Sequence, residues 1–189
     1  MLIVCEGEKT EPNYFRGLCS THRLSSANIR VVQSPGSDPM SIVQAAESEM
    51  EKNDYDRVFC VFDRDGHANF DAAVQRIAHS KAGKALKFQA IVSWPCFEMW
   101  ILLHFVYTTQ AFTASGGRTS CENVIRLIEP HYPGYKKGSK DIYDSVFPTI
   151  ADALTRGRQL EAHNRATNTS NPATAVHLLV DYLRNLRKK

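Results

Sequence analysis

The sequence predicts an α/β protein with a parallel sheet of about four strands, flanked by helices and followed by a helical C-terminal extension. Short apolar runs rich in β-branched residues alternate with stretches of helical periodicity over the first half of the chain. Parallel strands are joined by crossovers of this kind, which usually contain a helix. Two of the runs, at 2–5 and 57–62, are followed by carboxylates and a glycine. Ligands collect at such strand ends in open α/β sheets, so this edge is the candidate functional site.

Apolar periodicity and the residues that start or stop helices predict the other elements. Helix signals cover 11–23, with Pro12 in the first turn, and 39–52, with Asp38 as the expected N-cap. The remaining expected segments are a strand at 29–33, a helix from 69 or 71 to about 81, a strand at 86–93, a helix at 96–107, a loop at 108–120, a helix at 121–128, a loop at 131–140, a helix at 141–163 with a kink at Pro148, and a last helix opened by Asn171 and Pro172. We expect a core at 1–107 and an extension at 108–189 that packs on it as one compact unit.

Composition narrows the class of protein. The chain has 189 residues, of which 43% are hydrophobic, and this is enough for one ordinary core. No apolar stretch reaches the roughly twenty residues of a membrane span, and the chain starts with a strand instead of a basic leader. We therefore expect a cytoplasmic protein without a membrane partner.

The cysteines show no metal-binding or disulfide pattern. There are five, an odd number, without Cys-x-x-Cys spacing, and most lie in apolar surroundings: Cys5, Cys19, Cys60, Cys96 and Cys121. Such thiols are typically buried and reduced. The sequence therefore predicts neither a disulfide nor a zinc site.

Acidic residues follow the two apolar runs. Side chains alternate along an extended segment, so Asp63 and Asp65 point the same way and could converge on one hard cation. Glu6 could complete the site from a neighbouring strand, with Glu8 and Glu11 close by. In the alternative interpretation, each acid only caps a turn or a helix.

Four segments carry a family resemblance. They are Val-Cys-Glu-Gly-Glu-Lys-Thr-Glu-Pro-Asn-Tyr-Phe at 4–15, Val-Phe-Asp-Arg-Asp at 61–65, Pro-Cys-Phe-Glu-Met-Trp-Ile-Leu-Leu-His-Phe at 95–105 and Asn-Pro-Ala-Thr-Ala-Val-His-Leu-Leu-Val at 171–180. Together they resemble the RloB-like (AbiLii-type) proteins, small bacterial proteins linked to restriction-modification and abortive-infection loci. That family in turn resembles the Toprim domains of OLD nucleases, topoisomerases and primases. The resemblance implies a Toprim-like sheet in which Glu6, Asp63 and Asp65 bind Mg²⁺.

Glu98 stands alone among apolar residues. A buried carboxylate without a partner or a cation is costly, so Glu98 could be a further metal ligand, as could Glu8. It could equally be a first-turn residue that the helix dipole favours. His104 and His177 are interpreted as structural histidines, because their spacing suggests no metal site.

Positive charge is concentrated in the later part of the chain. Residues 1–70 have 7 Lys/Arg against 11 Asp/Glu, whereas residues 71–189 have 16 against 9. The loop at 131–140 combines Lys136, Lys137 and Lys140 with tyrosines, so it could contact phosphates and unpaired bases, or it could simply be a solvated loop. Lys9 and Arg64, beside the acids, are further expected nucleic-acid contacts.

These features favour phosphodiester hydrolysis of DNA or RNA with Mg²⁺ or Mn²⁺, and the family resemblance implies that it serves antiphage defence. Glu6, Asp63 and Asp65 would hold the cation, and Glu6 or Glu11 would act as the base. No Gly-x-Gly-x-x-Gly and no P-loop occurs, and no tyrosine is an evident covalent nucleophile. Two alternatives stay open: a non-catalytic nucleic-acid-binding or scaffold subunit, and a metal-dependent enzyme acting on a small nucleotide or tRNA. Partners could include an ATPase from the same defence locus or a second copy of the chain.

Overall fold

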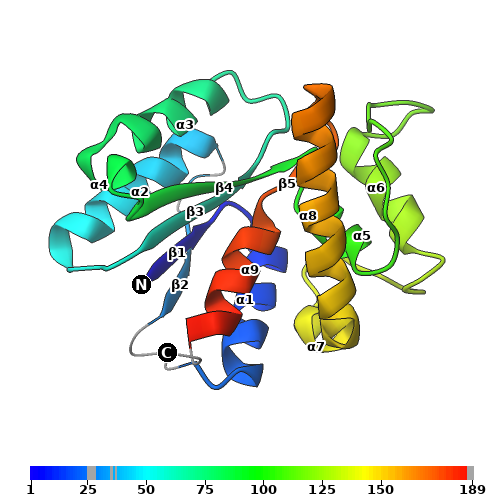
Figure 1. Cartoon of the computed structure of the whole chain (residues 1–189), viewed down its shortest axis with the longest axis horizontal. Coiled ribbons are helices and arrows are strands. Elements are labelled where there is room, and N and C mark those ends of the chain that lie inside the picture. Colours follow the sequence, from blue (N-terminus) through cyan, green and yellow to red (C-terminus); the bar gives the residue numbers. More distant parts are fainter. Residues whose placement is uncertain (25–28, 35, 37, 187–189) are drawn as a thin grey trace.

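The computed structural model describes residues 1–24, 29–34, 36 and 38–186. The chain alternates strands and helices up to residue 103 and is mainly helical after it (Figure 1). The elements are β1 (Leu2–Cys5), α1 (Thr10–Thr21), β2 (Arg30–Gln33), α2 (Pro39–Lys52), β3 (Val58–Asp63), α3 (Phe70–His79), α4 (Lys81–Lys84), β4 (Phe88–Trp94), α5 (Glu98–Leu103), α6 (Ser120–Ile128), α7 (Ile142–Val146), the 3₁₀ helix η1 (Phe147–Thr149), α8 (Ile150–Thr167), β5 (Ala173–Thr174) and α9 (Val176–Asn185).

One mostly parallel sheet organises the fold. Its strand order is β2-β1-β3-β4-β5, in which β1 to β4 pair in parallel and β5 pairs antiparallel with β4. Every residue of β1 is buried, as the continuous apolar run predicts for a strand covered on both faces. The α/β class and the parallel sheet flanked by helices are therefore confirmed.

The two faces of the sheet are covered by different helices (Figure 1). Leu2 and Val4 pack with apolar residues of α2 and α3, whereas Ile3 and Cys5 pack with those of α1, α5 and the C-terminal helices. This division follows from the alternation of side chains along β1. The second of these apolar clusters includes residues from α6 to α9, so the later helices share a core with the sheet.

Several local predictions are confirmed in detail. The Asp38 carboxylate accepts hydrogen bonds from the backbone N–H groups of Met40 and Ser41, and Pro39 is the first residue of α2. His104 is buried, with Nδ1 2.9 Å from the Val146 carbonyl oxygen, and burial lowers its pKa to about 3. His104 is thus a neutral core residue. Residues 108–119 contain neither a helix nor a named strand, as expected, and α6 begins at Ser120, one residue before its predicted start.

Three predicted helices differ in their bounds. The helix expected at 141–163 is divided near Pro148 into α7, η1 and α8, and α8 continues to Thr167. The apolar segment at 96–107 forms only the six-residue α5, and Val106, Tyr107 and the two threonines after them favour extended backbone. The last helix begins at Val176 instead of at 171–172, because residues 173–174 form β5 beside β4. Pairing with the sheet therefore replaces the expected first turn of that helix.

The expectation that no disulfide forms is also wrong. Cys96, just before α5, is bonded to Cys121 in α6, with 5.8 Å between their Cα atoms. Twenty-five positions separate them in the sequence, so local spacing could not reveal the pair. Cys5 and Cys60 are free and buried, as predicted. Among the described residues, no helix combines the length and the apolar character needed to cross a membrane.

Candidate active site

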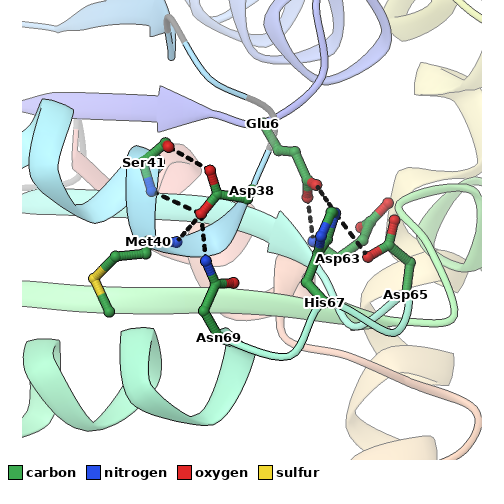
Figure 2. Close-up of polar contacts among 8 residues, drawn as sticks. All are labelled: Glu6, Asp38, Met40, Ser41, Asp63, Asp65, His67 and Asn69. Atoms are coloured by element: carbon green, nitrogen blue, oxygen red, sulfur yellow. Dashed lines mark hydrogen bonds and ion pairs between the residues drawn. The ribbon is translucent and has the colours of Figure 1, made fainter.

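The acidic residues that follow β1 and β3 lie at one edge of the sheet. In the parallel register Cys5 pairs with Val61, and the Glu6 backbone N–H donates to the Val61 carbonyl. The Glu6 side chain then turns toward β3, where its Oε2 accepts a 2.7 Å hydrogen bond from the Asp63 backbone N–H (Figure 2). The strand ends thus bring together two acids that are 57 positions apart.

A pocket of about 390 Å³ opens at this edge. Five acidic residues and two lysines surround the same space: Glu6, Glu8, Glu11, Asp63, Glu98, Lys9 and Lys137. Glu11 and Glu98 are only 6% and 2% exposed. This burial distinguishes them from acids that simply cap a solvated turn.

Gly7 makes room for one of the carboxylates. A Cβ atom at this position would lie 1.9 Å from Glu11 Oε2, well inside van der Waals contact. A side chain at position 7 would therefore displace the buried Glu11 carboxylate from the pocket. The glycine after β1 therefore allows this close approach of the Glu11 side chain.

The electrostatics of the pocket favour bound protons or a cation. The pKa of Glu6 is raised to about 7, mainly by burial and further by the charges of Asp65 and Glu11. Burial also raises the pKa of Asp63 well above its usual value, and the charges of Glu11, Glu6 and Glu98 add to that effect. The pKa of Glu11 is raised by burial and by Glu98. A divalent cation would relieve this repulsion.

Asp65 lies on the outer side of the same edge. Its side chain is 47% exposed, and its Oδ1 lies 3.4 Å from Nε2 of His67, which is itself 3.9 Å from Glu6 Oε1 (Figure 2). Glu6, Asp65 and His67 each offer a ligand atom, and the three atoms lie within 4.8 Å of one another. Glu6 therefore belongs both to this group and to the pocket that contains Asp63.

This donor set fits a divalent metal ion. Carboxylate oxygens are the usual ligands of Mg²⁺ and Mn²⁺, and an imidazole nitrogen is more typical of transition metals. Of the two ions, Mn²⁺ matches a set of carboxylates plus His67 better. The loop that carries Asp65 and His67 is held at its far end by Asn69, whose Nδ2 donates to the Asp38 Oδ1 atom at 2.5 Å (Figure 2).

Glu98 has partners from the C-terminal half of the chain. Tyr135 donates its hydroxyl to Glu98 Oε1 at 3.2 Å, and Lys137 Nζ lies 3.3 Å from Oε2. Cys121 Sγ lies 3.2 Å from Oε2, but as a disulfide sulfur it has no hydrogen to donate. Glu98 is thus both the first residue of α5 and a buried member of the pocket.

The basic residues proposed to contact nucleic acid occupy three places. Lys137 pairs with Glu98, while Lys136 and Lys140 are exposed on the same loop. That loop is fixed to α1, because Asn13 Nδ2 donates to the Gly138 carbonyl and the Gly138 N–H donates to Thr10 Oγ1.

The other two basic residues flank the acids. Lys9, which is exposed like Glu8, lies at the rim of the acidic pocket. Arg64 points to the other side of its loop, where it packs on Trp94. The basic side chains therefore lie on both sides of the acidic edge.

His67 and Tyr135 were not identified from the sequence. His67 continues the alternation of Asp63 and Asp65, so the pattern Asp-x-Asp-x-His could have revealed it. Tyr135 was considered only as part of a tyrosine- and lysine-rich loop. No local pattern indicates that its hydroxyl reaches Glu98, because 37 positions separate the two residues.

The raised pKa of Glu6 predicts a pH-dependent stability. Between about pH 4.5 and 7 the folded protein holds a proton on Glu6 that the unfolded chain releases, so metal-free stability falls as the pH rises through this range. The loss should be about 2 kcal/mol after allowance for solvent screening. Urea unfolding in EDTA at several pH values would measure it. Glu6→Gln should flatten the dependence, and an equal slope in both proteins would contradict the raised pKa.

Comparison with known proteins provides a family assignment. A family model described as RloB-like protein matches residues 1–183. The matched residues include all five strands of the sheet and every residue that lines the acidic pocket. No curated protein matches the chain.

Proposed function

Because the chain belongs to the RloB-like family, we propose that it is a metal-dependent phosphodiesterase that cleaves DNA or RNA in bacterial antiphage defence. The observation that carries this proposal is the convergence of Glu6, Asp63 and Glu11 at one strand edge, each with a raised pKa. Perturbed carboxylates in a pocket are characteristic of functional sites.

The residues divide into cation ligands and a base. Glu6, Asp63 and Asp65 would hold Mg²⁺ or Mn²⁺, with His67 as an additional ligand or as an orienting partner of Asp65. A bound divalent cation supplies charge neutralisation at the phosphate and lowers the pKa of water. Glu11 would accept the proton from the attacking water when its carboxylate is ionised, since a raised pKa makes that carboxylate a stronger base.

The exposed lysines of the 131–140 loop would hold the polyanion. Lys136 and Lys140 are exposed, and the loop that carries them is docked beside the pocket through Gly138. Changing both to alanine should weaken nucleic-acid binding several-fold and reduce the slope of log K against log[salt] by about 1.5. Filter binding over a salt series measures this. The control is a Lys81→Ala, Lys84→Ala protein, which loses equal charge on α4. Equal slopes in all three proteins would contradict the assignment.

Cleavage of labelled substrates tests the proposed function. Single-stranded and duplex DNA and RNA should be cut by the wild type with Mn²⁺ or Mg²⁺ but not in EDTA, and Glu11→Gln should reduce the rate strongly while the protein still folds. Cutting at the same rate by the variant would indicate a contaminant. Binding without cutting by the wild type under all conditions would instead favour a non-catalytic nucleic-acid-binding subunit.

A further inference from the structure

A second pocket lies on the opposite side of the loop that carries Asp65 and His67. It has a volume of about 470 Å³ and is bounded by α3, β4, β5, α8 and α9. This volume falls within the range of small-molecule sites. Its walls are largely apolar and include Phe70, Val92, Trp94 and Leu178. Leu178 is 50% exposed, so an apolar side chain of the pocket is accessible from solvent.

Arg64 is a cationic member of the pocket's polar lining, whose other members are Asp71, Glu161, Asn164, Thr169, Ser170, Thr174 and His177. Its guanidinium carbon lies 4.3 Å from the centre of the Trp94 ring and 5.0 Å from that of Phe70. Packing on two aromatic rings holds the guanidinium in place while its N–H groups remain able to donate. Among the described residues, the carboxylate within salt-bridge range is that of Asp71, which is 4.0 Å away and 77% exposed. An ion pair so long and so exposed contributes little, so a bound anion could readily take its place.

The position of Arg64 connects this pocket with the acidic one. Arg64 lies between Asp63 and Asp65 in the sequence, and its side chain projects to the other side of the chain. Its backbone N–H donates to the Ser93 carbonyl at 2.8 Å, next to Trp94, so the two pockets are fixed to the same strand ends. A strand whose phosphate is held at Asp63 would therefore place a neighbouring nucleotide near Arg64.

We propose that this pocket, named here the Arg64 pocket, binds one unpaired nucleotide of the strand that the acidic site cleaves. Arg64 contacts the phosphate of that nucleotide, and its base enters the apolar cavity beside Trp94 and Phe70. A base buried in such a cavity cannot remain paired or stacked in a duplex, so the substrate is single-stranded or unpaired at this point. The inference rests on the proposed phosphodiesterase function and specifies its substrate class.

Tryptophan fluorescence provides a direct test. The chain has two tryptophans, and Trp100 is fully buried whereas Trp94 lines the Arg64 pocket. In EDTA, a short single-stranded oligonucleotide should quench the emission in a saturable manner, and Trp94→Phe should remove this response. A duplex of the same sequence should bind more weakly. Inorganic phosphate should cause no change, and a mononucleotide should bind more weakly than the oligonucleotide.

Arg64→Lys tests the polar contact. The variant keeps the positive charge but loses the planar guanidinium that packs on Trp94 and Phe70. Its affinity for the single strand should therefore fall about tenfold. Lys84→Ala, which removes a charge on α4 before the start of β4, should bind normally. Mn²⁺ bound at the acidic site should raise the melting temperature of the wild type. The same rise in Arg64→Lys would show that the acidic site is intact.

The possible outcomes separate this inference from the proposed function. Cleavage by the wild type without quenching, or equal affinity in Arg64→Lys, would overturn the Arg64 pocket and leave the phosphodiesterase proposal in place. Equal binding of duplex and single strand, or tighter binding of the mononucleotide, would overturn the substrate class. Quenching that depends on Arg64 without cleavage under any condition would support the pocket and contradict the proposed function.

Discussion

Asp63→Asn is expected to reduce cleavage at least about 100-fold and at the same time to stabilise the metal-free protein. Asp63 is crowded by Glu11, Glu6 and Glu98, and its pKa is raised well above normal, so keeping it ionised at neutral pH costs free energy. Asparagine removes that charge. Its side-chain oxygen can still accept the bond that the Phe97 backbone N–H makes with the carboxylate.

Melting curves in EDTA and in Mn²⁺ would test this prediction together with the cleavage assay. The variant should melt at a higher temperature than the wild type in EDTA and should show little further rise with Mn²⁺. Asp54→Asn is a matched control, because that carboxylate is exposed and belongs to neither the acidic pocket nor the Arg64 pocket. A variant that melts lower without metal but still responds to it would contradict the account of Asp63.

The second large effect is expected at Glu98, where alanine and glutamine should behave differently. Glu98→Ala leaves a cavity and removes the acceptor of the buried Tyr135 hydroxyl, so it should cost about 2–4 kcal/mol. Glu98→Gln keeps an acceptor for Tyr135 and removes a negative charge near Asp63 and Glu11. It should therefore stay within about 1 kcal/mol of the wild type.

Urea unfolding of the two variants in EDTA decides between the two interpretations of Glu98. If Glu98 only favoured the first turn of α5, both changes would cost about 1 kcal/mol or less. A loss of about 1 kcal/mol or less in Glu98→Ala would contradict the interpretation of Glu98 as a buried member of the acidic pocket. Strong destabilisation of Glu98→Ala together with near-normal stability of Glu98→Gln would support that interpretation. The Lys137 side chain is 55% exposed, so its ammonium group should stay in contact with water in either variant.

Local patterns were sufficient to predict the sheet and its acidic edge. Continuous apolar runs identified β1 and β3, and the rule that parallel strands end at one edge predicted that Glu6 and Asp63 would be neighbours. The N-cap Asp38 was recognisable because the cap depends only on residues adjacent in sequence.

The features that were missed depend on contacts between distant parts of the chain. The short strand β5 is stabilised by pairing with β4 and has only two residues, too few for a period to be visible. The Cys96–Cys121 disulfide and the Tyr135–Glu98 hydrogen bond join residues that are 25 and 37 positions apart, so neither leaves a local sequence pattern. Lys137 was considered only as a phosphate contact because its partner cannot be identified from loop composition.

Calorimetric titration of Mn²⁺ into the wild type and into Asp63→Asn tests the acidic pocket most directly. The account predicts saturable binding to the wild type at neutral pH, with release of protons because the pKa of Glu6 is about 7. It also predicts that Asp63→Asn loses most of that binding. No saturable binding to the wild type at millimolar Mn²⁺, or equal binding to both proteins, would contradict the central claim that this cluster is a metal site.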